Sequence, residues 1–172
     1  MRSTFICFLL GACAACGTMD VTPPPMTSEP KPTAKTSGPK IDKELQRFVD
    51  EFMLDCQARR TDCAKKLGRI SSIAVTAIPD DNPNDNELII GLCHDRFFTH
   101  RIEINKEIMN KPDMYLRVLI YHEIGHCAYG LDHEKEPDRI MSPMMPGLLT
   151  LLQHWNEMVT DYFATIQEKH GD

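Results

Sequence analysis

The chain has 172 residues, 42% of them hydrophobic and 26% charged, and this content is enough for one domain with a buried core. The first 40 positions hold 4 of the 19 Lys and Arg residues and 2 of the 25 Asp and Glu residues, which leaves 15 against 23 and a formal net charge of −8 for the rest. Because so acidic a domain repels phosphate groups, its composition excludes nucleic acid and anionic lipid surfaces as expected partners.

Residues 1–16 have the pattern of an export signal, with Arg2, a short apolar run and small residues before a cysteine. The stretch Leu10-Gly-Ala-Cys13 resembles a bacterial lipobox, in which the cysteine is lipidated and becomes the first residue of the mature protein. Cys16, which follows two alanines, is the alternative lipidation site, and a plain secretory signal cleaved nearby is the simpler hypothesis. We expect an exported, membrane-anchored lipoprotein that faces the periplasm or the cell exterior.

Residues 17–40 are rich in proline and nearly free of large apolar side chains, so they cannot build a core. We predict that this segment is a semi-extended tether and that one folded domain occupies residues 41–172. Behind a lipid anchor, the tether would hold the domain away from the membrane, and the anchor would be its only membrane contact.

The first half of the domain contains signals for one helix and three strands. Apolar residues at helical spacing predict an amphipathic helix over 41–58. Runs rich in β-branched and apolar residues predict strands over 70–78 and 87–93, with a turn-forming cluster at 79–86 between them. Alternating residues over 100–104 predict a third strand with one face in water. These elements indicate an α+β domain with a short, twisted sheet.

A helix that begins near Pro112 is apolar on almost every side, so we expect it to be buried. His122 and His126 are four residues apart on this helix, and their imidazoles can therefore bind one metal ion together. Glu123 lies about 100° further round the helix, near the metal rather than under it, which suits a general base. Because an unpartnered polar group is costly in a buried helix, a metal is the natural partner of the two histidines.

Gly130 is well placed to end this helix in a left-handed conformation, which would let His133 return as a third nitrogen ligand. Three protein ligands leave a fourth position open on a zinc ion, and this openness distinguishes catalytic zinc sites from structural ones. The sequence therefore predicts one zinc ion per chain, bound by three histidines. The alternative is a buried helix with incidental histidines.

These residues, together with Ile140-Met141-Ser142-Pro143, resemble the metzincin zinc peptidases, and Gly130-Leu-Asp-His133 is most similar to the matrixin branch. The resemblance implies a small metzincin-like domain, in which a mixed sheet packs on the zinc-binding helix and a C-terminal helix. It also implies a Met-turn that places Met141 under the zinc ligands, and a sheet edge along the substrate cleft, for which we take strand 100–104. The family places its glycine one residue earlier, so we expect a zinc helix one residue longer.

The C-terminal helix carries a rival for the third ligand. Asn156-Glu157-x-x-x-Asp161 resembles the motif with which thermolysin-like enzymes supply a glutamate to zinc. Helical spacing predicts a different buried stripe, made of Leu148, Leu152, Trp155, Val159, Tyr162 and Ile166. Glu157 lies about 180° from the centre of this stripe, so we expect its side chain in solvent.

Four cysteines fall inside the domain, and an even number in an exported domain suggests disulfides. We favour Cys56 with Cys63, because they are close in sequence, and Cys93 with Cys127, because this bond would tie a strand to the zinc helix. The other pairings and buried free thiols remain open.

Two functions are consistent with these features. The first is a zinc metalloendopeptidase that hydrolyses a peptide or protein substrate with a water activated by the metal and with Glu123 as the general base. The second is a non-catalytic envelope lipoprotein that keeps the fold for binding. Glu123 favours the enzyme, because a site that only binds has no need of a base beside the metal.

Overall fold

The computed structural model of the chain describes residues 38–60, 62–79, 89–96 and 99–171. Cys13, Cys16, nearly all of the predicted tether and most of the predicted turn cluster lie outside these residues. Within them, no helix is both long and apolar enough to cross a membrane.

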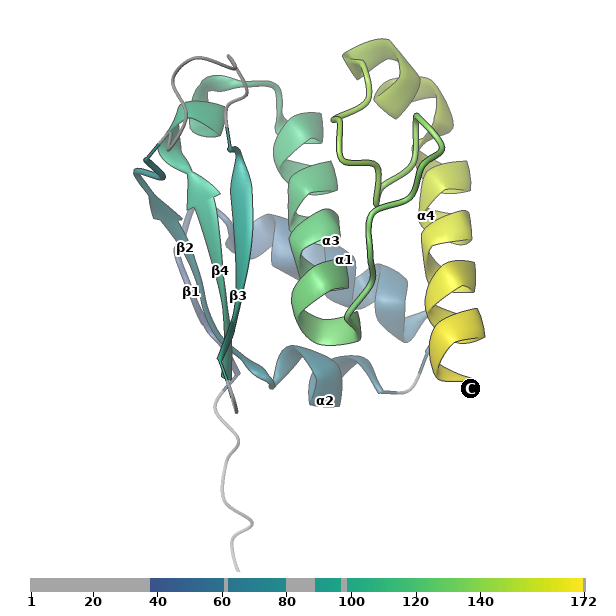
Figure 1. Ribbon diagram of the computed structural model, residues 1–172, viewed down its shortest axis with the longest axis horizontal. Helices are drawn as coiled ribbons and strands as arrows, with labels where there is room; N and C mark the ends of the chain where they lie inside the picture. The colour runs from purple at the N-terminus through teal and green to yellow at the C-terminus, as the bar shows by residue number, and fades with distance from the viewer. Residues whose placement is uncertain (1–37, 61, 80–88, 97–98, 172) are drawn as a thin grey trace, which may run out of the picture. The chain divides into compact units, whose positions relative to one another are not determined.

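The described residues form a four-stranded mixed sheet in the order β1-β2-β4-β3 (Figure 1). Its strands are β1 (Lys40–Ile41), β2 (Ile70–Thr76), β3 (Gly91–Arg96) and β4 (Thr99–Asn105). β2 pairs in parallel with both β1 and β4, whereas β3 and β4 are antiparallel. The mixed sheet and the α+β class predicted from the sequence are therefore present.

The strand predicted over 100–104 is present as β4, but its expected place at the edge of the sheet was wrong. β4 has a strand on each side, and β3 is the edge strand beside the buried helix (Figure 1). The reason is the short connection between the two strands. Their register already pairs Arg96 with Thr99, so β3 folds back along one side of β4 while β2 occupies the other side.

Three element boundaries also differ from the predictions, and the strand predicted over 70–78 ends at Thr76 as β2. Ile41 lies in β1, where it pairs with Ile73, and the first helix, α1 (Gln46–Gln57), begins five residues later. Asp42 separates the two elements, because its carboxylate accepts a hydrogen bond of 2.9 Å from the Val75 amide and its carbonyl accepts one from Leu45. The strand predicted over 87–93 begins at Gly91 and continues to Arg96, because its ladder with β4 extends to that residue.

The helix predicted from Pro112 is α3 (Asp113–Tyr129), and it lies between the sheet and α4 (Leu148–His170) (Figure 1). Eleven of its residues are buried, as its nearly continuous apolar sequence predicts. Two shorter elements complete the described fold, α2 (Cys63–Leu67) and the 3-10 helix η1 (Lys106–Asn110).

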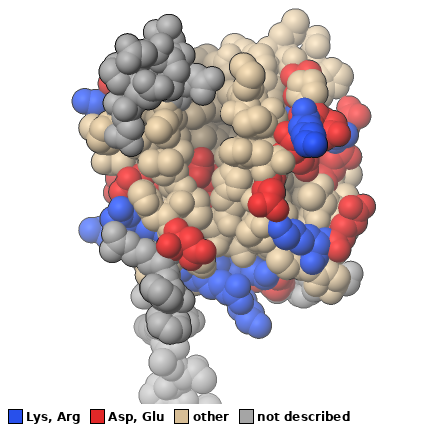
Figure 2. All heavy atoms as spheres, viewed as in Figure 1, with Lys and Arg blue, Asp and Glu red and all other residues tan. Residues whose placement is uncertain are grey.

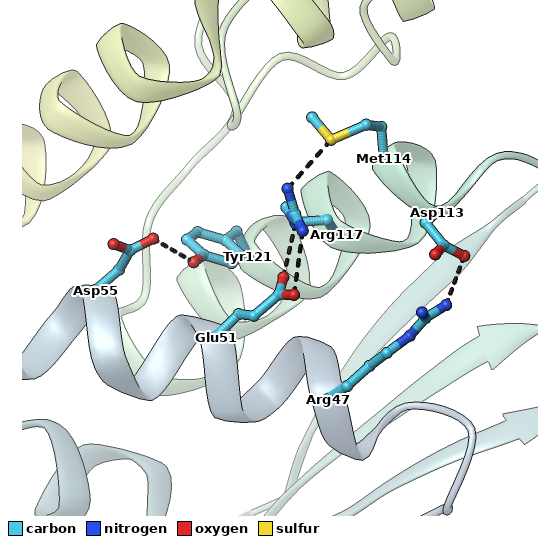
Figure 3. Close-up of polar contacts among 7 residues, drawn as sticks. All are labelled: Arg47, Glu51, Asp55, Asp113, Met114, Arg117 and Tyr121. Carbon is cyan, nitrogen blue, oxygen red and sulfur yellow. Dashed lines mark hydrogen bonds and ion pairs between the residues drawn. The ribbon is translucent and has the colours of Figure 1, made fainter.

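Three polar pairs join α1 to α3, and each pair links residues that are 66 positions apart (Figure 3). The pairs repeat every four residues on both helices, so the helices run in the same direction with one face of each in contact. This contact fixes the rotation of α3 about its axis. The pairs are Arg47 with Asp113 at 2.5 Å, Arg117 with Glu51 at 2.7 and 3.1 Å, and Tyr121 with Asp55 at 2.7 Å.

Both disulfides favoured from the sequence are confirmed. Cys56 and Cys63 join α1 to α2, with their Cα atoms 6.0 Å apart. Cys93 and Cys127 join the edge strand β3 to α3, with their Cα atoms 5.5 Å apart. The second bond therefore connects the sheet covalently to the helix that carries the predicted metal ligands.

The stripe predicted for α4 is correct in its second half and wrong at its start. Leu151 is fully buried, whereas Leu152, which was predicted to be buried, is 61% exposed. The first turns contain leucine at positions 148, 149, 151 and 152, so they are apolar on most sides and periodicity alone cannot choose the buried face. The observed stripe consists of Leu151, Met158, Val159, Tyr162, Phe163 and Ile166.

Candidate metal and catalytic site

α3 ends at Tyr129, and Gly130 caps it in the left-handed conformation with φ 60° and ψ 32°. The Gly130 amide donates to the carbonyl of His126, and the Leu131 amide donates to the carbonyl of Gly125, each at 3.0 Å. The Gly130 bond is the 5→1 bond of an αL helix cap, and with the Leu131 bond it turns the chain back toward the helix. The helix is one residue longer than the metzincin pattern would make it, as expected, and the turn still returns His133 to the site.

The structure brings the imidazoles of His122, His126 and His133 together. The Nε2 atoms of His122 and His126 are 3.0 Å apart, and those of His122 and His133 are 3.2 Å apart. One ligand nitrogen from each of the three residues lies within 4.8 Å of the others. His122 and His126 are partly buried under the turn, and His133 is exposed at its outer side.

Backbone carbonyls fix the tautomers of the two helical histidines. Nδ1 of His122 lies 2.7 Å from the Ile140 carbonyl, and Nδ1 of His126 lies 2.7 Å from the carbonyl of Leu131. A carbonyl oxygen can only accept, so both Nδ1 atoms carry a proton. Burial lowers the pKa of His122 to about 4 and also lowers the pKa of His126, so both rings are neutral at pH 7.

Neutral rings that are protonated at Nδ1 have a lone pair on Nε2. The 3.0 Å contact between the Nε2 atoms of His122 and His126 is therefore a contact between two acceptors, which repel each other unless a cation lies between them. A tetrahedral zinc ion with zinc–nitrogen bonds of about 2.0–2.1 Å places its ligand nitrogens about 3.3 Å apart. The observed separations of 3.0 and 3.2 Å are within about 0.3 Å of this spacing.

Glu123 lies on the next position of α3, and it is only 4% exposed. Burial raises the pKa of this carboxyl to about 8. The Glu123 carboxyl also lies against the backbone of β3, because a Cβ atom placed on Gly91 would come within 2.5 Å of Glu123 Oε1. A buried carboxyl beside a three-histidine cluster combines a shifted acid–base group with metal ligands in one place.

These four side chains open into a pocket of about 530 Å³ between β3, α3 and the segment 140–146. Figure 2 shows that the surface over the facing parts of β3 and α3 is mostly uncharged. Apart from Glu123 and the histidines, the pocket lining has no charged side chain among the described residues. Its walls are apolar and include Ile89, Ile90, Leu92, Val118, Leu119, Ile140, Pro143, Met145 and Pro146.

The structure places Met141 against the site helix, with 1% of its surface exposed. A Cβ atom built on Gly125 would lie 2.7 Å from Met141 Sδ, so the thioether fills the space beside the helix backbone next to His126. The carbonyl of Met141 accepts a hydrogen bond of 2.9 Å from the Glu134 amide, which closes the loop that carries His133. Met141 thus packs against α3 at Gly125, one residue before His126.

Glu157 lies apart from the three histidines. Its side chain is 74% exposed, and it contacts His154 at 3.4 Å on the same helix. Among the described residues, only His122, His126 and His133 bring three metal-ligating groups together. Three other histidines contact residues outside the cluster: His94 contacts Glu103, His100 contacts Asp95, and His170 contacts the Tyr129 carbonyl.

The sequence interpretation gave no role to Gly91, which the structure places against Glu123. A glycine inside a strand pattern often marks a close approach of another group to the backbone. Gly91 falls inside the predicted strand 87–93, so this signal was present in the sequence.

Comparison of the chain with models of known protein families, with curated proteins and with solved structures finds no match. The case for a function therefore rests on the geometry of the site.

Proposed function

We propose that this protein is a zinc-dependent peptidase of the metzincin type. One observation carries the proposal. The Nε2 atoms of His122 and His126 lie 3.0 Å apart beside the buried Glu123 carboxyl, and backbone carbonyls hold both rings so that their Nε2 lone pairs point toward each other. His122, His126 and His133 would hold the zinc ion, and Glu123 would act beside it. Neutral imidazoles in a set of three are typical ligands of catalytic zinc.

When bound, zinc would polarise the carbonyl of the peptide bond and make a water molecule more acidic. Glu123 is the residue placed to take a proton from the attacking water and to pass it to the leaving amine. In the metal-free chain, burial raises the pKa of Glu123, so its surroundings favour the protonated form that the carboxyl would adopt after taking up the proton. Most of the residues that line the pocket beside Glu123 are apolar.

The substrate would be an extended peptide or an unfolded protein. Among the described strands, β3 has a neighbour on one side only, so its other side can pair with an added strand. β3 also contributes residues 91–93 to the pocket wall, next to Glu123. A peptide paired with β3 would therefore pass the candidate catalytic residues, which is the arrangement the sequence interpretation had assigned to strand 100–104.

The compartment is part of the proposal. Two disulfides within one domain are typical of proteins that fold in an oxidising compartment, and they therefore support export. Together with the lipobox-like stretch that ends at Cys13, they favour a lipoprotein that displays its domain in the periplasm or outside the cell.

Two alternatives have weaker support. A thermolysin-like site would need Glu157 as a ligand, but this side chain is exposed and pairs with His154. A non-catalytic lipoprotein would use the histidines for binding alone. Such a protein has no use for Glu123, because burying a carboxyl without a charged partner is costly to the fold.

The test is Glu123→Gln in the oxidised mature domain, with zinc content and cleavage of an unfolded protein measured on the same sample. We expect one zinc ion per chain in wild type and variant, and a rate about 10²–10⁴-fold lower in the variant because the base is lost. Glu157→Gln is the matched control and should change neither quantity. If zinc-loaded wild type cleaves no substrate that the Glu123→Gln variant leaves intact, the enzyme hypothesis is refuted and the binding lipoprotein is favoured.

A further inference from the structure

The edge strand and the site helix meet through two matched pairs of residues. Gly91 and Cys93 are two apart on β3, so they lie on the same face of the strand. Glu123 and Cys127 are four apart on α3, so they lie on the same face of the helix. Gly91 faces Glu123, and Cys93 is bonded to Cys127. The disulfide therefore lies in the same contact between β3 and α3 as Glu123, two residues further along the strand and four residues further along the helix.

The contact at Gly91 leaves no room for a side chain. A Cβ atom there would lie 2.5 Å from Glu123 Oε1, 2.9 Å from its carboxyl carbon and 2.9 Å from Leu119 Cδ1. Because real Cβ atoms essentially never come within 3.0 Å of another atom, the β3 backbone itself forms the wall against which the carboxyl rests. A shift of β3 would change where that carboxyl can lie.

β3 has a neighbouring strand on one side only, since among the described strands it pairs only with β4. On the face toward α3, Gly91 has no side chain to pack, and Leu119 of α3 lines the pocket beside it. The Cys93–Cys127 bond is the covalent link between the strand and the helix within this contact. His122 and His126 are held instead by carbonyls of the segment that follows α3, and these hydrogen bonds do not involve β3.

We propose that the Cys93–Cys127 disulfide is a positioning clamp, which holds Gly91 against Glu123 so that the proposed peptidase is fully active only when the bond is formed. This inference rests on the proposed function. The bond forms when two thiols exchange with an oxidant disulfide, which accepts the two electrons and the two protons and leaves as two thiols. The chain would thus bind zinc in either redox state and reach full activity after it enters an oxidising compartment.

The test compares two double variants that each remove one disulfide, Cys93→Ser/Cys127→Ser and the matched control Cys56→Ser/Cys63→Ser. Zinc content, kcat and KM are measured on the full mature chain at a temperature where circular dichroism shows both variants folded. We expect the first variant to keep its zinc and lose kcat by about 10²-fold, the scale of a 1 Å misplacement of a reacting group, while the control keeps its kcat. Equal kcat losses in both variants, or no loss in the first, would overturn the clamp.

Gly91→Ala tests the same contact with both disulfides intact. Reaching an ordinary contact distance of 3.4 Å requires a shift of 0.9 Å from 2.5 Å, so we expect a kcat loss of similar scale with zinc retained. Shortening the acid by Glu123→Asp withdraws the carboxyl from Gly91, so adding Gly91→Ala to Glu123→Asp should cause little further loss. If Gly91→Ala lowers kcat by the same factor in the Glu123→Asp background as in wild type, the inference is overturned.

Hydrogen exchange separates failure of the clamp from failure of the proposed function. The amides of β3 should exchange faster in Cys93→Ser/Cys127→Ser than in the control variant, whether or not the protein is a peptidase. If wild type has no activity, the proposed function fails and the exchange rates alone decide the clamp. Equal rates in the two variants would overturn it.

Discussion

Gly125→Ala probes how tightly the segment after the metal site packs on the helix that carries it. Gly125 lies in α3 between Glu123 and His126, and the position that a Cβ atom would take there faces the side chains of Met141 and Tyr162. A Cβ atom there would lie 2.7 Å from Met141 Sδ, 3.1 Å from the hydroxyl of Tyr162 and 3.2 Å from Tyr162 Cε2. The substitution therefore pushes on both residues at once.

Two effects of opposite sign determine the stability of this variant. Alanine in place of glycine favours a helix interior by about 1 kcal/mol. Against this gain, the Met141 contact must lengthen by 0.7 Å, from 2.7 to 3.4 Å, and the Tyr162 ring must also give way. Met141 can swing its end aside, but Tyr162 is buried and donates a 2.9 Å hydrogen bond to the Tyr121 carbonyl. Overpacking costs about 1–3 kcal/mol and the hydrogen bond about 1 kcal/mol, so after the helix gain we expect a net loss of about 1–3 kcal/mol.

Urea unfolding of the metal-free protein measures this loss directly. Gly38→Ala is the control, because a Cβ atom there meets nothing within 4 Å, and its free energy of unfolding should stay within about 0.5 kcal/mol of wild type. In a Met141→Ala background, Gly125→Ala should cost less than in wild type, by the part of the loss that comes from the Met141 contact. A Gly125→Ala protein as stable as wild type would show that the segment yields freely, and the close packing inferred for Met141 would then be wrong.

Three further outcomes are expected. Between about pH 7 and 8, where burial keeps His122 and His126 neutral in the folded chain and an unfolded histidine is mostly neutral, folded Glu123 with its pKa of about 8 keeps most of a proton that the unfolded chain has lost. The stability of the metal-free protein should therefore fall as pH rises, by up to about 1.4 kcal/mol per unit, and Glu123→Gln should flatten this slope in urea unfolding. His133→Ala should lower zinc affinity in a competition assay with a chromogenic chelator, and undiminished affinity would exclude it as a ligand. Cys13→Ser with Cys16→Ser should move the protein from the membrane to the soluble fraction, and a soluble wild type with an unmodified N-terminus would contradict the anchor.

The residues of the candidate site could be predicted because their geometry is local. His122 and His126 are brought together by helix periodicity alone, and His133 needs only the left-handed turn at Gly130. These interactions extend over twelve consecutive residues, so no knowledge of the sheet is required. The hydrogen bond from His122 to the Ile140 carbonyl is the first contact in the cluster that depends on a more distant segment.

The order of the strands could not be predicted in the same way. The pattern of apolar residues in a strand indicates which side chains face the core, but it does not indicate which other strand pairs with it. β3 and β4 have similar lengths, and either one could have been the edge from its composition. What decides the order is the hairpin register between Arg96 and Thr99 together with the parallel pairing of β2 to the free side of β4. The cleft therefore borders β3, a consequence of pairing between segments that are far apart in the chain.

The rotation of α3 presents the same difficulty and has a direct bearing on function. The helix is apolar on almost every side, so its sequence has no single stripe that determines which residues face the sheet. Tyr121 and Glu123 are two positions apart and point about 200° from each other. The hydrogen bond from Tyr121 to Asp55 turns one side of the helix toward α1 (Figure 3), and the opposite side, with Glu123 and Cys127, therefore faces β3. The polar pairs with α1 thus help to place the proposed base in the cleft, although none of them touches the metal ligands.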